Sequence, residues 1–110
     1  MNPQPPTIVT LTTDLDLTTV GCSVAIDICS MWWGRMELIT TGLIGSSVVT
    51  LMVDVAGGGF EPHTECSEMT LTEALTQARV GYVDGLKYQI CVITPATAGT
   101  LTTKMLLKKI

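Results

Sequence analysis

The chain has 110 residues, of which 46% are hydrophobic and 15% are charged. This length predicts a single domain, and so high an apolar content excludes a disordered tail, which buries too little surface to offset its ordering entropy. Ten acidic residues against six basic ones give a net charge of −4, which disfavours nucleic acid as a partner. The longest uncharged runs, 38–53 and 88–103, contain Thr, Ser and Gly and are too short to span a bilayer, so no membrane partner is expected.

Three prolines, Pro3, Pro5 and Pro6, mark the beginning of the sequence. They predict an extended, polyproline-like N-terminal arm over 1–6, followed by one β-sandwich domain over 7–110. We expect the arm to lie outside the core and to be a candidate contact with a neighbouring subunit. The first residues have neither the positive charge nor the apolar stretch of a secretory signal, so we expect the chain to be made and folded in a cytoplasm.

Thr, Val and Ile make up about a third of the chain, and branching at Cβ favours strands over helices. The first expected strand is 7–12. Strict alternation then predicts half-buried strands at 23–28 and 35–40. Their expected inward residues are Val24, Ile26 and Ile28 in the first, and Met36 and Leu38 in the second.

Residues 41–46 contain two glycines and predict a turn before the next strand, 47–55. The residues of that strand expected to face inward are Val49, Leu51, Val53 and Val55. Gly57–Gly59 then predict a hairpin turn, because glycine adopts the positive φ that such a turn needs.

Residues 70–78 are ambiguous between helix and strand. Thr70 and Glu73 form a capping-box pattern, which favours a helical turn, whereas interspersed threonines and a nearby glycine oppose a long helix. We therefore expect a strand at 78–83 and leave open one short helical turn near 71–76.

Asp84-Gly85 predicts a two-residue hairpin between that strand and the next, 86–94. The last strand is expected at 100–109, after a turn over 94–99. The inward residues are expected to be Tyr88, Ile90 and Val92, and then Leu101, Met105 and Leu107. About eight short strands without alternating helices predict an all-β fold, an antiparallel β-sandwich of jelly-roll or Ig-like type.

The four cysteines form no C-x-x-C pair, which argues against a zinc site. Expected assembly in a cytoplasm argues against disulfides. We therefore expect all four thiols to be reduced, with Cys91 directed away from the face that carries Tyr88, Ile90 and Val92. The four residues are Cys22, Cys29, Cys66 and Cys91.

Three sequence features suggest a catalytic or ligand-binding site, and each has a simpler structural interpretation. His63 is the only histidine and lies in the acidic stretch 61–66, but the spacing supports neither a metal site nor a Cys-His pair, so we expect a polar loop residue. Asp14 and Asp16 lack the pattern of a calcium loop and are expected to be solvated turn residues. Gly57–Gly59 precede no helix that could hold a phosphate. We expect no catalytic, metal or cofactor site, and no enzyme.

Trp32 and Trp33 are adjacent, and neighbouring residues of an extended chain face opposite sides. One indole is then directed away from the core. Packing of both under a loop, a subunit interface and a sugar-stacking platform all remain open. Because the small domain has few charges, much of its surface must be uncharged, which favours a homo-oligomer.

The order of these features resembles small β-sandwich virion proteins of tailed bacteriophages, of the capsid decoration, cement or head-fibre type. The features are a Trp-Gly turn leading into a strand at 33–38, an alternating strand and glycine hairpin at 48–60, a Gly-x-Lys-Tyr strand from Gly85, an Ala-Gly-Thr turn at 98–100 and a last strand ending Leu-Lys-Lys. The resemblance covers 21–109. The chain departs from the pattern in its four cysteines and in Ala-Gly-Gly-Gly where Asp-Gly-Gly and Trp are common.

The resemblance implies a non-enzymatic structural protein on the outer capsid surface of a phage head. Its expected partners are the major capsid protein and further copies of itself, with a homotrimer favoured. The interface candidates are Trp32, Trp33, Pro3, Pro5 and Pro6. The alternatives are a carbohydrate-binding, lectin-like sandwich and a structural component of a phage tail or fibre.

Overall fold

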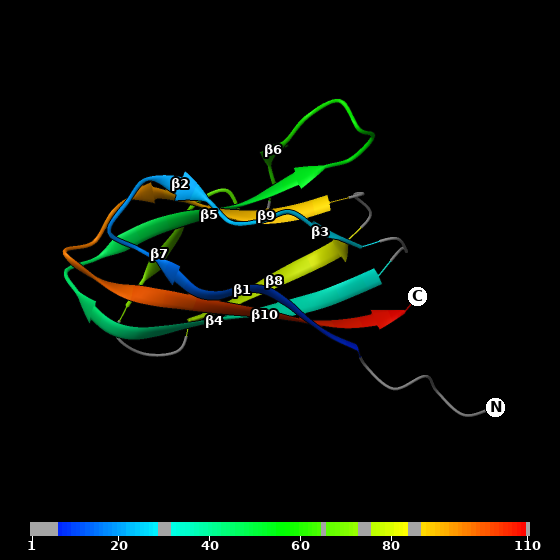
Figure 1. Ribbon diagram of the computed structural model, residues 1–110. Helices are drawn as coiled ribbons and strands as arrows, with labels where there is room; N and C mark the ends of the chain where they lie inside the picture. Colours follow the sequence, from blue (N-terminus) through cyan, green and yellow to red (C-terminus); the bar gives the residue numbers. More distant parts are fainter. Residues whose placement is uncertain (1–6, 29–31, 65, 73–75, 84–86, 110) are drawn as a thin grey trace.

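The computed structural model describes residues 7–28, 32–64, 66–72, 76–83 and 87–109. Within these ranges the chain forms ten strand segments in two antiparallel sheets, which face each other as two layers (Figure 1). The predicted all-β antiparallel sandwich is therefore confirmed.

The strand order of each sheet follows from the backbone pairing. The four-stranded sheet has the order β1 (Thr7–Asp16), β10 (Ala98–Lys109), β4 (Trp32–Ile44) and β8 (Thr76–Val83). In the six-stranded sheet, β9 (Lys87–Thr94) and β5 (Ser47–Asp54) lie at the centre. The short segments β2 (Gly21–Cys22) and β3 (Ile26–Asp27) pair with β9, and β6 (Glu61–Pro62) and β7 (Met69–Leu71) pair with β5.

The whole chain is one long hairpin folded over on itself. If β2 and β3 count as one interrupted strand, and β6 and β7 as another, the chain has eight strands. The first pairs with the eighth, the second with the seventh, the third with the sixth and the fourth with the fifth. Successive pairs alternate between the two sheets. This is the topology of a jelly roll, one of the two predicted alternatives.

The core lies between the sheets and is built from the alternating strands. Most residues predicted to face inward on β4, β5, β9 and β10 are buried, which confirms these four patterns. They are Met36, Leu38, Val49, Leu51, Val53, Tyr88, Ile90, Val92, Leu101, Met105 and Leu107. Val55 is the exception, with an exposed fraction of 58%, because β5 ends at Asp54.

The predicted strand 23–28 is wrong over its first half. The ladder with β9 includes Gly21–Cys22 and Ile26–Asp27, and between them the backbone bonds to β9 through the Ser23 amide. Val24 is 79% exposed instead of facing the core. A side chain interrupts the ladder here, because the Ser23 hydroxyl accepts the hydrogen bond from the Ile90 amide at 3.0 Å.

Two predicted turns are strand in the structure. Gly34, expected in a Trp-Gly turn, lies inside β4, where it pairs with Leu107. A Cβ at this position would lie 2.5 Å from the Leu106 carbonyl oxygen, so the glycine permits close approach of two strands. Further along, β4 continues to Ile44, so the expected turn over 41–46 shrinks to the link between Ile44 and Ser47.

The predicted hairpin at Asp84-Gly85 is also wrong. Its own residues lie outside the described ranges, but β8 belongs to the four-stranded sheet and β9 to the six-stranded sheet, so the segment connects two layers instead of two paired strands. Of the open helical turn near 71–76, Leu71 ends strand β7 and Thr76 begins strand β8, and 73–75 lie outside the described residues.

Candidate interaction surfaces

The outer face of the four-stranded sheet combines aliphatic and charged side chains. Ile8, Leu106 and Arg35 lie in one row across β1, β10 and β4, and Lys104 lies opposite Glu37 in a neighbouring row. Together these five residues line a hollow of about 180 Å³. Ile8 is 65% exposed, so the face offers apolar area beside its charges.

Most of the positive charge of this acidic chain belongs to the four-stranded sheet. Five of the six basic residues lie in its strands, and the sixth, Lys87, lies in β9 of the other sheet. The five are Arg35, Arg79, Lys104, Lys108 and Lys109. An acidic partner would be attracted to this sheet and repelled by much of the remaining surface.

The outer face of the six-stranded sheet is different because its centre has no charge. Val48, Met52 and Gln89 are half-buried there and Ile93 is 46% exposed. Charged positions occur at one end only, in the row in which Asp27, Lys87 and Asp54 pair. The two outer faces therefore suit chemically different partners.

A disulfide lies on this second face, contrary to the predicted reduced thiols. Cys22 of β2 and Cys91 of β9 are directly opposite in the ladder and are bonded, with a Cα–Cα distance of 4.0 Å. The strand register of the jelly roll brings the two cysteines together, and their spacing along the sequence did not indicate this. Cys91 faces away from Tyr88, Ile90 and Val92 as predicted. Cys66 is a buried, reduced thiol as expected, and Cys29 lies outside the described residues.

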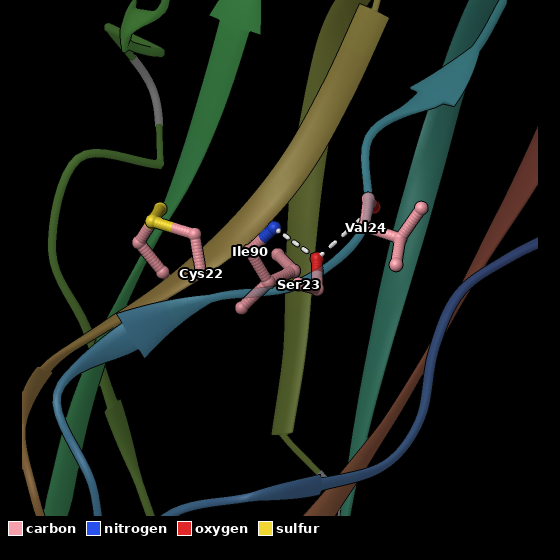
Figure 2. The surroundings of a disulfide bond; sticks show 5 residues. Cys22, Ser23, Val24 and Ile90 are labelled. Atoms are coloured by element: carbon pink, nitrogen blue, oxygen red, sulfur yellow. Dashed lines mark hydrogen bonds between the residues drawn. A yellow bond between two sulfur atoms is a disulfide. The ribbon is translucent and has the colours of Figure 1, made fainter.

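Ser23 follows Cys22 and also attaches the β2–β3 edge strand to β9 (Figure 2). Its amide donates to the Ile90 carbonyl at 2.8 Å, and its hydroxyl accepts from the Ile90 amide and donates to the Val24 carbonyl at 3.4 Å. The covalent bond and these hydrogen bonds hold the edge to β9 across the gap between β2 and β3. A hollow of about 350 Å³ lies beside them, lined also by Leu11 and Leu15 of β1.

The residues considered as candidate catalytic or metal-binding groups lie in different parts of the fold. His63 lies in a loop as predicted but is buried, and its backbone bonds with Leu51 and Cys66. Asp14 and Asp16 are exposed, as predicted, but belong to β1 instead of a turn. Hydrogen bonds from the Thr18 hydroxyl and amide lower the pKa of Asp16. Among the described residues, no three His, Cys, Asp or Glu side chains group as metal ligands would.

The glycine run is placed as predicted. Gly57 and Gly59 both have positive φ and lie in the turn between β5 and β6. The Gly57 amide donates to the Asp54 carboxylate at 2.7 Å, which fixes the start of the turn. This hairpin is the tip of the long folded hairpin described above.

Of the predicted interface residues, the two tryptophans are described in their backbone alone. Trp32 and Trp33 begin β4 and pair with Lys109 and Lys108 of β10, so the extended backbone assumed for them is present. The directions of their side chains lie outside the described part of the structure, as do Pro3, Pro5 and Pro6 entirely.

No protein-family model and no curated protein matches this sequence. In the part of the chain that the structure describes, none of the elements is a helix with the length and apolar character needed to cross a membrane.

Proposed function

We propose that this chain is a structural virion protein that decorates and cements the head of a tailed bacteriophage, and that it has no enzymatic activity. The observation that carries the proposal is the pair of unlike outer faces on a small jelly-roll sandwich, both with exposed aliphatic side chains. Such a molecule offers two surfaces for partners, and among its described residues no three His, Cys, Asp or Glu side chains group together. The order of features in its sequence also resembles that of phage decoration proteins.

The outer face of the four-stranded sheet is the proposed contact with the major capsid protein. Arg35 and Lys104 are exposed there beside the aliphatic Ile8 and Leu106, so a capsid surface with acidic and apolar groups would complement it. A protein that binds the assembled shell alone stabilises it by mass action, because binding shifts the equilibrium away from disassembled subunits.

Co-sedimentation with purified heads of the source virus tests this proposal. We expect saturable binding of the wild-type chain, loss of binding in Arg35→Glu/Lys104→Glu, and a higher temperature of head disruption when the protein is bound. Lys87→Glu is the matched control, because Lys87 is exposed on the other sheet, and it should bind as the wild type does.

Failure of the folded wild-type chain to bind heads contradicts the proposal. Saturable quenching of tryptophan fluorescence by one class of sugar, in a titration with a glycan panel, would favour the lectin-like alternative.

A further inference from the structure

Each sheet of the sandwich ends in two edge strands, whose unpaired N–H and C=O groups can accept a strand from another molecule. Folded proteins commonly protect such edges with breaks, bulges, prolines or charges. The four edges of this molecule are β1 and β8 in one sheet, and the interrupted strands β2–β3 and β6–β7 in the other. They are protected to very different degrees.

Both edges of the six-stranded sheet are broken. The β2–β3 edge leaves the ladder between Cys22 and Ile26, and the exposed Val24 side chain lies in the gap. The β6–β7 edge contains Pro62, which has no N–H to offer, and a bulged loop follows it. Neither edge presents a regular row of backbone groups.

The β1 edge is protected over its second half only. Its register with β10 shifts after Thr10 and again after Thr12, and Asp14 has a φ of 50°. Before the first shift, Thr7–Thr10 pair regularly with β10 and carry no charge. Ile8 in this stretch is 65% exposed.

The β8 edge has no break, bulge or proline from Thr76 to Val80, and Arg79 is the one charged residue of this stretch. Its pairing with β4 is uninterrupted from Val80 to Thr76, and the strand contains no proline. Its other side pairs with no strand among the described residues. The two regularly paired stretches, Thr7–Thr10 and Thr76–Val80, thus lie at the opposite edges of one sheet.

We infer that copies of this chain associate head to tail, with the β8 edge of one copy pairing with Thr7–Thr10 of the next. Neighbouring strands alternate in direction across β1, β10, β4 and β8, so β1 and β8 run in opposite directions. Copies related by an axis along the strands therefore bring the two edges together as an antiparallel pair. The inference rests on the homo-oligomer that the sequence analysis expects of the proposed decoration protein, and it names the contact.

Charge favours this contact over pairing of β8 with a second β8. Arg79 lies in the middle of β8, so two such strands would bring like charges together, whereas Thr7–Thr10 are uncharged. A head-to-tail contact also leaves one free edge at each end of a dimer. Association then continues until a ring closes, and the expected trimer is such a ring.

A charge swap tests the contact by sedimentation velocity. The row of backbone pairs that contains Ile8, Leu106 and Arg35 reaches β8 at Arg79. A contact that continues this row from copy to copy sets position 8 opposite Arg79, so we expect the positive charge of Ile8→Lys to raise the dissociation constant of self-association at least tenfold. The double variant Ile8→Lys/Arg79→Glu should restore association. Val24→Lys is the matched control on a protected edge, where another exposed aliphatic residue receives the same charge and association should not change.

Melting temperatures of all variants establish that each is folded. The inference is overturned if Ile8→Lys is folded and associates as the wild type does. It is also overturned if Val24→Lys weakens association as much as Ile8→Lys does. A wild-type chain that binds heads as a monomer overturns it while leaving capsid attachment standing. If association is lost in Ile8→Lys and restored in the double variant, but the wild-type chain does not bind heads, the contact between copies stands and the proposed function is contradicted.

Discussion

Gly34 shows how a single hydrogen in place of a side chain sets the distance between two strands. Replacing it with alanine places a Cβ 2.5 Å from the Leu106 carbonyl oxygen and 2.8 Å from Leu107 Cδ2, and backbone cannot move aside cheaply. We expect Gly34→Ala to lower the free energy of unfolding by about 1–3 kcal/mol.

Denaturant unfolding measures that change. Gly58→Ala is the matched control, since nothing lies within 4 Å of its added Cβ and its φ is not positive. Equal stabilities of the two variants would contradict the close strand approach at Gly34.

Ionisation of Asp16, at the end of β1, makes folding stability depend on pH. The Thr18 hydroxyl donates to its carboxylate at 2.6 Å and the Thr18 amide at 2.8 Å, which favours the charged form and lowers the pKa below the ordinary value of 3.8. The contribution of the group to stability is therefore fully present above pH 3.8 and is lost as the pH falls through the folded-state pKa.

Carboxyl chemical shifts recorded by NMR against pH test this assignment. In Thr18→Ala the pKa of Asp16 should move up toward its ordinary value, because the hydrogen bond that lowers this pKa most is removed. An unchanged titration curve in that variant would contradict it.

At the scale of elements, the β2–β3 edge depends on one hydroxyl. Ser23→Ala leaves the Ile90 amide without its acceptor, and we expect a loss of about 1 kcal/mol in the free energy of unfolding. Hydrogen exchange at the Ile90 amide should become faster, while Ser23→Thr, which keeps a hydroxyl, should retain protection. Unchanged exchange in Ser23→Ala would show that the hydroxyl does not hold this edge.

The sequence predicted the long strands well, because Met36, Leu38, Leu51 and Ile90 follow the period of two that a half-buried strand imposes. Its errors have one physical origin, since local patterns do not report which strands pair. Asp84-Gly85 has hairpin composition, yet the flanking strands belong to different sheets.

The candidate surfaces were only partly predictable for the same reason. Alternation placed Arg35 and Glu37 outward, but the register with β10 is what brings Lys104 beside them. In the same way, Thr103 is fully buried opposite Leu38, where the Thr12 hydroxyl contacts it at 3.0 Å. That five of the six basic residues share one sheet also follows from the strand pairing and is not visible in their sequence positions.

At the scale of the whole molecule, the disulfide joins the second strand of the long hairpin to the seventh, with a sequence separation of 69. Closing so long a loop restricts the unfolded chain, which in the chain-entropy account stabilises the fold by about 4 kcal/mol. We expect Cys22→Ser/Cys91→Ser to melt at a lower temperature than the oxidised wild type.

Peptide mapping without reduction checks the pairing itself. The Cys22 and Cys91 peptides should be recovered linked, and alkylation of the denatured, unreduced chain should label neither of them. Recovery of both as free, labelled peptides from freshly prepared protein would restore the original expectation of reduced thiols.

The long hairpin also constrains how the chain reaches this structure. Only the pair that flanks Gly57–Gly59 joins neighbouring segments, whereas β1 must find β10 from the other end of the chain. Loop-closure entropy therefore favours zipping outward from the glycine turn, with each pair shortening the loop that the next must close. The four-stranded sheet, which holds the first and last strands, would then be completed last, and folding would be slow for a chain of this size.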